Sequence, residues 1–273
     1  MSLEDVSSQP LPSLPPRKAD AHKGDFGRVI CLGGSWGMAG AISITGLSAL
    51  RSGAGLTTLA IPSSILQTVA SFSPCYTTVP LVEDREGIID QANVMDLTEA
   101  REKFDAWAIG PGLGRSEGVA ELVARLYRAV PRPLVVDADG LNGLANVLRR
   151  EQELLAAPGG ARILTPHPGE FARLTGGASI ATAEQRMEQA AALCQSDPSG
   201  NTIVVLKGHR TVVSDGRRVA INATGNPGMA TGGAGDCLTG VVAALTAQGL
   251  SAWDAARLGV HVHGLAGDLA AAQ

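Results

Sequence analysis

Short apolar runs alternate with longer stretches of helical periodicity along most of the chain. Continuous apolar runs are typical of strands that are buried on both faces, as in parallel sheets covered by helices. The expected strands are residues 28–32, 56–61, 106–109, 134–136, 162–164 and 203–206. Helical length and spacing occur at residues 40–52, 117–129 and 183–195. This alternation predicts β-α-β units throughout.

The C-terminal part of the chain has a different pattern. Two short apolar runs, residues 211–213 and 219–221, are separated by Ser-Asp-Gly-Arg-Arg, which predicts a hairpin. Two apolar helical stretches follow, residues 237–247 and 252–273. We therefore expect an α/β fold with a doubly wound, mostly parallel sheet and helices on both faces, in a single domain over residues 22–273.

Residues 1–21 have a composition of their own. Four prolines between residues 10 and 16 lie among serines and charged side chains, a mixture that favours extended and poorly packed chain. We expect a flexible, proline-rich lead-in at residues 1–21 and folded structure from about His22.

Composition excludes several classes of protein. Hydrophobic residues make up 45% of the 273 residues and the formal net charge is −4, so neither wholesale disorder nor nucleic-acid binding is expected. The four cysteines form no Cys-x-x-Cys pair, which argues against a disulfide framework or a zinc site. No apolar run reaches membrane-spanning length and no signal peptide is evident, so the cytoplasm is the expected location.

Two glycine-rich turns follow expected strands. Gly33–Gly40 and Gly110–Gly114 each lie between a strand and a helix, where backbone N–H groups can meet an anion or where the chain simply makes a tight connection. Neither has the Gly-x-Gly-x-x-Gly spacing of dinucleotide-binding dehydrogenases, and the chain contains no Gly-Lys dipeptide, so the phosphate loop of P-loop NTPases is absent.

The most informative motif spans residues 226–236 and reads Asn-Pro-Gly-Met-Ala-Thr-Gly-Gly-Ala-Gly-Asp. Its glycines let backbone N–H groups converge before an apolar helix, whose N-terminus attracts anions. Asp236 follows directly. It could be an N-terminal helix cap, but a carboxylate beside a phosphate site is better explained as a base that takes a proton.

Other polar residues allow two interpretations each. His167 lies between two prolines, a rigid setting suited either to substrate contact or to a structural role in the turn. Asp137 and Asp139 could assist a metal ion or phosphates, or could serve as turn and cap residues. His261 and His263 are two apart on an expected helix and point in different directions, so we interpret them as structural.

Taken together, the motifs carry a resemblance. Gly-Gly-Ala-Gly-Asp before a helix is similar to the Gly-x-Gly-Asp signature of ribokinase-like kinases. Within that superfamily the chain resembles the ADP/ATP-dependent NAD(P)H-hydrate dehydratases. The matching segments occur in order from about residue 17 onward: residues 22–27, 33–41, 110–114, 137–142, 165–170, 207–211 and 226–236.

The resemblance implies repair of hydrated NADH or NADPH, S epimer, by a carbon–oxygen lyase. ADP or ATP would phosphorylate the ring hydroxyl, and elimination of phosphate would restore the double bond. Asp236 would take the hydroxyl proton, while amides of Gly233, Ala234 and Gly235 hold the transferring phosphoryl group.

The resemblance also implies binding residues. Ala41, Gly114, His167 and Asp236 would contact the hydrated dinucleotide. The nucleotide would contact Gly235 and a loop of five residues, namely Lys207, Gly208, His209, Arg210 and Thr211. Ribokinase-like kinases organise Mg²⁺ through an Asn-x-x-Glu pattern. This chain has His-Pro-Gly-Glu, so only Glu170 matches, as a ligand through water.

A homo-oligomer, a tetramer by resemblance, is expected. The family also occurs fused to an epimerase that interconverts the hydrate epimers, so the chain is either a stand-alone dehydratase or an excised half with an epimerase partner. Two other functions remain open. A hydroxyethylthiazole or hydroxymethylpyrimidine kinase would share the anion site and the aspartate but release a stable phosphorylated product. A non-catalytic nucleotide sensor would not need Asp236.

Overall fold

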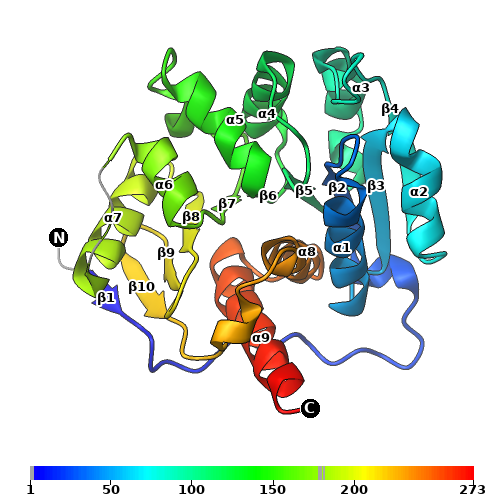
Figure 1. The fold of residues 1–273 in the computed structure, drawn as a ribbon. Helices are drawn as coiled ribbons and strands as arrows, with labels where there is room; N and C mark the ends of the chain where they lie inside the picture. Colours follow the sequence, from blue (N-terminus) through cyan, green and yellow to red (C-terminus); the bar gives the residue numbers. More distant parts are fainter. Residues whose placement is uncertain (1–2, 178–179, 181) are drawn as a thin grey trace.

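The computed structural model describes residues 3–177, 180 and 182–273 and forms, over these residues, one ten-stranded sheet between two helical layers (Figure 1). Along the sheet the strand order is β1-β10-β9-β8-β7-β6-β5-β2-β3-β4. The strands are β1 Glu4–Asp5, β2 Arg28–Leu32, β3 Leu56–Pro62, β4 Thr77–Leu81, β5 Ala106–Ile109, β6 Leu134–Val136, β7 Arg162–Leu164, β8 Thr202–Leu206, β9 Val212–Ser214 and β10 Arg218–Ile221.

The sheet is parallel except around one strand. β9 pairs antiparallel with β8 and with β10, and the other pairings are parallel. The predicted doubly wound, mostly parallel sheet is therefore confirmed, and the predicted hairpin is β9–β10. In a parallel sheet all carboxyl ends point the same way, so the loops that follow β2, β5, β6, β7 and β8 gather at one edge.

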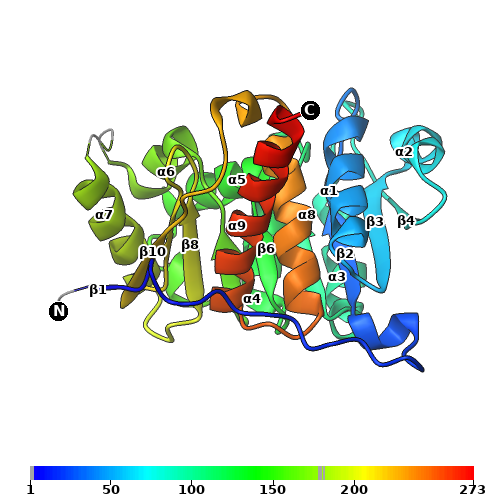
Figure 2. The ribbon, with the colours of Figure 1, turned by 90° about the horizontal axis from the view of Figure 1, so that it is seen from below.

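Helices cover both faces of the sheet. Their bounds are α1 Ala39–Arg51, α2 Leu66–Phe72, α3 Val94–Glu99, α4 Glu117–Ala129, α5 Ala138–Leu148, α6 Pro168–Thr175, α7 Ala183–Gln195, α8 Ala234–Ala247 and α9 Ala252–Ala271. In one hydrophobic cluster, the five helices from α3 through α7 pack against one face of the sheet. In a second cluster, α1, α2, α8 and α9 pack against the other face. Figure 2 shows α8 and α9 side by side across that second face.

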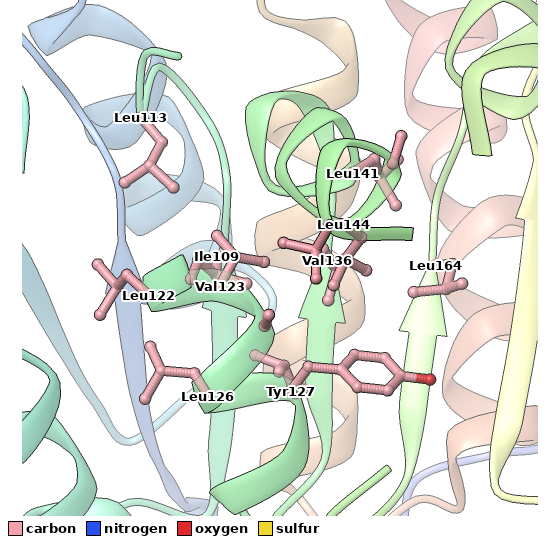
Figure 3. Packing of buried hydrophobic residues seen from close by; sticks show 14 of the residues in the cluster. Ile109, Leu113, Leu122, Val123, Leu126, Tyr127, Val136, Leu141, Leu144 and Leu164 are labelled. Atoms are coloured by element: carbon pink, nitrogen blue, oxygen red, sulfur yellow. The ribbon is translucent and has the colours of Figure 1, made fainter. Parts of the chain in front are cut away.

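Strand residues alternate between the two clusters. In β5, Trp107 and Ile109 belong to the first cluster and Ala108 to the second, as the two-residue period of a strand requires. Figure 3 shows Ile109 and neighbouring strand residues facing α4 and α5. The α4 side chains Leu122 and Leu126 are fully buried there, and each burial contributes about 1.5 to 3 kcal/mol.

The N-terminal segment differs from the expected poorly packed lead-in. Residues 1 and 2 lie outside the described residues, but Glu4 and Asp5 pair with β10, and Val6 is 1% exposed. The segment then runs along the edge of the molecule below α9 and α8 in Figure 2. Apolar residues of this segment pack against the surface of the folded domain. The composition of the segment alone does not predict this contact. Arg17 also stacks on Phe26 at 3.7 Å from the ring centre.

The structure adds elements that the pattern did not predict. β4 is an edge strand with threonines and a proline, so its outer face is exposed and its apolar signal is weak. The helices α5 and α6 begin within motifs that we interpreted as turns, at Asp137–Asn142 and at Pro168. Proline suits the first helical position because its missing N–H would have no partner there. In the same way α8 begins at Ala234, three residues before the expected start, so Asp236 lies inside its first turn.

Candidate active site

The candidate residues gather where the carboxyl ends of β6, β7 and β8 face the N-terminus of α8. Asp137 follows β6, Glu170 lies in the first turn of α6 after β7, and Lys207 follows β8. Asp236 comes from α8, on the opposite helical layer. Segments more than a hundred residues apart thus meet at the edge where parallel sheets bind ligands.

The first turn of α8 lies where the sequence predicts an anion hole. Gly233 caps the helix with a φ of 90°, a left-handed conformation that favours glycine. The first N–H groups of a helix have no partner within it, and the Ala234 amide makes only a long contact, 3.5 Å, to the Thr231 carbonyl. Nothing described lies within 4 Å of the place where a Cβ on Gly232 would be. Backbone donors and open space therefore meet at this turn.

Asp236 has the properties of a proton acceptor. Burial, reinforced by the nearby negative charge of Asp137, raises the pKa of its carboxyl from 3.8 to about 6, although Lys207 acts in the opposite direction. The N-cap position of α8 is Gly233, with no side-chain cap, so Asp236 is not the helix cap that was its alternative interpretation. A carboxylate with a pKa near 6 is suited to general base catalysis at neutral pH.

An ion pair between Lys207 and Asp137 lies next to Gly235 in the glycine turn. The carboxylate of Asp137 is 1% exposed, and it accepts hydrogen bonds from Lys207 Nζ at 2.6 Å and from the Thr239 hydroxyl at 2.7 Å. A Cβ on Gly235 would lie 3.2 Å from Lys207 Nζ. Asp137 therefore neither caps α5 with its side chain nor lies free for a metal ion; it connects β8 and α8.

Glu170 adds a second carboxylate to this pair. It is 6% exposed, and one of its oxygens lies 4.0 Å from Lys207 Nζ. Burial raises the pKa of Glu170, and Lys207 partly opposes that effect. Two buried carboxylates thus share one ammonium group. The remaining negative charge would be stabilised by a further cation.

His167 has a structural role in this arrangement. Its Nδ1 accepts from the Gly169 amide at 2.9 Å, while the Glu170 carboxylate accepts from the His167 amide at 2.8 Å. This reciprocal capping begins α6. The His167 side chain is still 50% exposed, so the structural interpretation is correct as far as it goes, and a substrate contact stays a prediction.

Most of the expected nucleotide loop lines one pocket. Lys207, Gly208, His209 and Arg210 line this pocket of about 350 Å³ together with α7 residues such as Arg186, and Lys207 also donates to Asp137. Arg186 also donates to the His209 carbonyl at 2.6 Å, and the Thr211 hydroxyl donates to the Gly208 carbonyl at 3.0 Å. These bonds hold the loop in its strained turn, in which Arg210 has a φ of 54°.

The expected substrate loops lie together. A Cβ on Gly112 would be 3.1 Å from the Ala41 Cβ, and the Gly34 amide donates to the Pro111 carbonyl at 2.9 Å. Gly114 donates its amide to Asp139 Oδ2 at 3.1 Å. Asp139 thus orders the second glycine loop, and the tight packing of the two loops agrees with their interpretation as close connections.

Two residues of this site were not predicted as functional. Thr239 lies one turn after Gly235 in a mostly apolar helix, and this spacing could have identified it. His263 was interpreted as structural, yet it makes a backbone hydrogen bond with Ala234, and burial lowers its pKa. Sequence offers no signal for that contact, because α9 meets α8 only in the folded molecule. The described residues contain no group of three or more metal-ligating side chains and no helix able to cross a membrane.

Fold and site define a class of protein first. The fold of this chain is similar to that of a ribokinase-like superfamily protein from Enterococcus faecalis, with a TM-score of 0.76 and 27% identity over 95% of this chain and 85% of the other. An ADP/ATP-dependent NAD(P)H-hydrate dehydratase from Bacillus subtilis, co-crystallised with ATP and Mg²⁺, gives a TM-score of 0.76 and 31% identity over 95% of this chain and 86% of that one.

The family follows from the sequence match. Residues 29–273 match the NAD(P)H-hydrate dehydratase family model, and the chain belongs to that family. It is 44% identical over 262 residues to the bifunctional NAD(P)H-hydrate repair enzyme of Moorella thermoacetica, covering 95% of this chain and 48% of that protein. The chain spans about half the length of the curated relatives it matches.

Proposed function

We propose that this chain dehydrates the S epimer of hydrated NADH or NADPH in a reaction that consumes ADP or ATP. The observation that carries the proposal is Asp236, a carboxylate with a pKa raised to about 6 in the first turn of α8, directly beside the glycine anion hole. Family membership supports the same function.

The proposed reaction has two steps. Asp236 takes the proton of the ring hydroxyl as its oxygen attacks the terminal phosphorus of the nucleotide, and AMP or ADP leaves. The ring nitrogen then donates its electron pair, the carbon–oxygen bond breaks with loss of inorganic phosphate, and a proton leaves the adjacent ring carbon. The double bond of the dihydronicotinamide is restored, and no oxidant or reductant is needed.

The chain's own residues would hold both reactants. Amides of Gly233, Ala234 and Gly235 would bind the transferring phosphoryl group, as backbone donors stabilise charge that develops in a transition state. The loop from Lys207 to Thr211 would bind the nucleotide, with the pocket lined by Gly208, His209 and Arg210 receiving it.

The hydrated dinucleotide would lie against Ala41, Gly114 and His167. The first two belong to loops that meet beside the site. Half of the His167 side chain remains exposed after it caps α6. This assignment leaves the nucleotide and the dinucleotide on different loops, as a transfer between them requires.

Mg²⁺ fits the charge of the site. Glu170 and Asp137 exceed the single positive charge of Lys207, and the pKa of Glu170 is raised by its burial. Glu170 would hold Mg²⁺, through water, alongside the phosphates, in the way that Mg²⁺ commonly binds with few protein ligands. A bound Mg²⁺ would neutralise phosphate charge during transfer.

Partners follow from the family relationship. A homo-oligomer, specifically a tetramer, is proposed, and exposed Val262, Leu265 and Leu269 on α9 offer apolar surface for it. An epimerase would be the partner activity, because an enzyme specific for one epimer leaves the other unrepaired and the relatives are named bifunctional.

The function is tested by incubating the protein with hydrated NADH and each nucleotide in the presence of Mg²⁺. Reduced nicotinamide absorbs at roughly 340 nm. We expect this absorbance to rise in step with the release of phosphate. A stable phosphorylated dinucleotide without that rise would instead indicate a kinase.

A further inference from the structure

A second hollow of about 360 Å³ lies among α4, α5 and α6, helices that cover the same face of the sheet (Figure 1). Arg115, Arg149 and Arg173 line it, together with Glu117 and Asp139. We call this hollow the arginine groove. Three guanidinium groups against two carboxylates give it a positive charge, unlike the chain as a whole, whose net charge is −4.

Most of the charges in the arginine groove already have partners. Arg115 binds Asp139 at 3.0 Å, Arg173 donates to the Asn142 carbonyl oxygen at 2.8 Å, and Glu117 is paired with Arg150 outside the groove. Within the described ranges, the Arg149 side chain has neither a hydrogen bond nor an ion pair. Arg149 therefore offers a full set of donors to an anion.

The arginine groove adjoins the reacting centre. Gly114 lines it, and the Gly114 amide binds Asp139. The charge of Asp139 is among those that raise the pKa of Asp236, so the two carboxylates are within electrostatic reach of each other. A molecule with one end at Asp236 and its other end in the groove would pass Gly114.

The geometry points to the arginine groove as the site of the adenosine end of the hydrated dinucleotide, with Arg149 binding the 2′-phosphate that distinguishes hydrated NADPH from hydrated NADH. This inference rests on the proposed function, which places the nicotinamide ring at Asp236. The other pocket, at Gly208–Arg210, is then free for the phosphoryl donor. Guanidinium groups bind phosphate through paired hydrogen bonds and stay charged at all physiological pH values.

The first test compares Michaelis constants for both hydrates in the parent and in Arg149→Gln. Loss of a charge-assisted contact should raise the KM for hydrated NADPH about tenfold more than the KM for hydrated NADH. Arg125→Gln is the matched control, because Arg125 is an exposed arginine of α4 that does not line the groove. A ratio of KM values that stays within about twofold of the parent's, or that shifts equally in the control, overturns the assignment.

A binding measurement separates this inference from the proposed function. With ADP saturating, adenosine 2′,5′-bisphosphate should bind the parent and Arg125→Gln equally in calorimetry, and Arg149→Gln about tenfold more weakly. Absence of binding to the parent, or equal binding to all three proteins, overturns the inference whatever the activity. A parent that binds the bisphosphate through Arg149 but turns over neither hydrate refutes the proposed function alone.

Discussion

At the residue scale, the site depends on how burial distributes charge. Lys207 lies close to both Asp137 and Glu170, and the charges of all three act on the carboxyl of Asp236. Crowded carboxylates favour the protonated form of at least one member. Asp236 is the least buried of the three, and the proposed function places it beside the bound hydroxyl, with which it would exchange a proton.

The raised pKa of Asp236 predicts the pH dependence of turnover. A base acts when deprotonated, so kcat/KM should fall about tenfold per pH unit below about 6 and level off above it. An aspartate with its usual pKa of 3.8 would place that limb more than two pH units lower. Initial rates between pH 4.5 and 8, at fixed ionic strength, measure the limb. A plateau that continues down to pH 4.5 would contradict a base with the raised pKa of Asp236.

Gly235→Val tests the anion hole. A Cβ there meets Lys207 Nζ at 3.2 Å and Asp137 Oδ2 at 3.6 Å, so the branched side chain should disturb the ion pair and obstruct the amides. We expect nucleotide affinity to fall by at least about tenfold, roughly the value of one or two good hydrogen bonds. Calorimetry with ADP and ATP measures it, with Gly235→Ala as the smaller change. Parent-like affinity in the valine variant would remove the anion hole from the account.

The sequence predicts this site unevenly. Gly233, Gly235 and Asp236 are adjacent in the chain, and their residue types carry a local signal. The pairing of Asp137 with Lys207 and Thr239 joins three separate segments, and which carboxylate takes the lysine depends on packing that no single segment specifies. Lys207 therefore occupies a supporting position that the motif alone did not indicate.

At the element scale, α1 and α8 pack unusually closely. A Cβ on Gly240 would lie 2.1 Å from the Thr45 carbonyl oxygen of α1, so only glycine fits at that crossing. This close approach is one of the contacts that position α8, and α8 carries Asp236 in its first turn. The position of the helix therefore depends in part on one small residue in the core.

Gly240→Ala should therefore destabilise the protein by about 1 to 3 kcal/mol through overpacking, despite the higher helix propensity of alanine. Nucleotide affinity should fall as α8 shifts. Urea unfolding and calorimetry measure the two effects. Gly40→Ala in α1 is the control, because no described atom lies within 4 Å of its Cβ position, and it should be neutral or stabilising. Equal stability of both variants would contradict the proposed packing.

Buried strands were predictable as elements because their apolar runs are continuous, as in β5 and β8. β4 was not, since its exposed side carries the polar residues of an edge strand. α5 and α6 begin with glycine- and proline-containing motifs that also occur in turns. Where a local signal is ambiguous, tertiary packing decides between helix and turn.

At the scale of the whole molecule, the N-terminal segment packs against the folded domain. In the N-terminal segment, the short strand β1 pairs with strand β10. The segment then passes beneath α9 and α8, at the edge of the sheet opposite the start of α8 (Figure 2). Arg17 reaches the Gly53 carbonyl at 2.8 Å and Gln248 at 3.1 Å. These contacts join the beginning of the chain to α1 and α8 without touching the site.

Val6→Ala tests how much the packing of the N-terminal segment stabilises the protein. Val6 is 1% exposed, and removal of two buried methyl groups should cost about 1 to 2 kcal/mol in the free energy of unfolding. Activity should stay at the parent level, since Val6 lies far from the reacting residues in the sheet order. Chemical denaturation measures the free energy of unfolding, with Val82→Ala, at an exposed valine outside the proposed oligomer surface, as control. A difference below about 0.3 kcal/mol between the two variants would mean that the segment contributes little stability.

The most direct measurement is turnover by Asp236→Asn beside its affinity for nucleotide. Asparagine keeps the shape of the side chain but cannot take a proton. The kcat for formation of the dihydronicotinamide should therefore fall by about 100- to 10,000-fold. ADP and ATP should still bind with nearly parental affinity in calorimetry, because the glycine amides are unchanged. A variant that keeps its rate within a few-fold of the parent would contradict the assignment of Asp236 as the base that starts phosphoryl transfer.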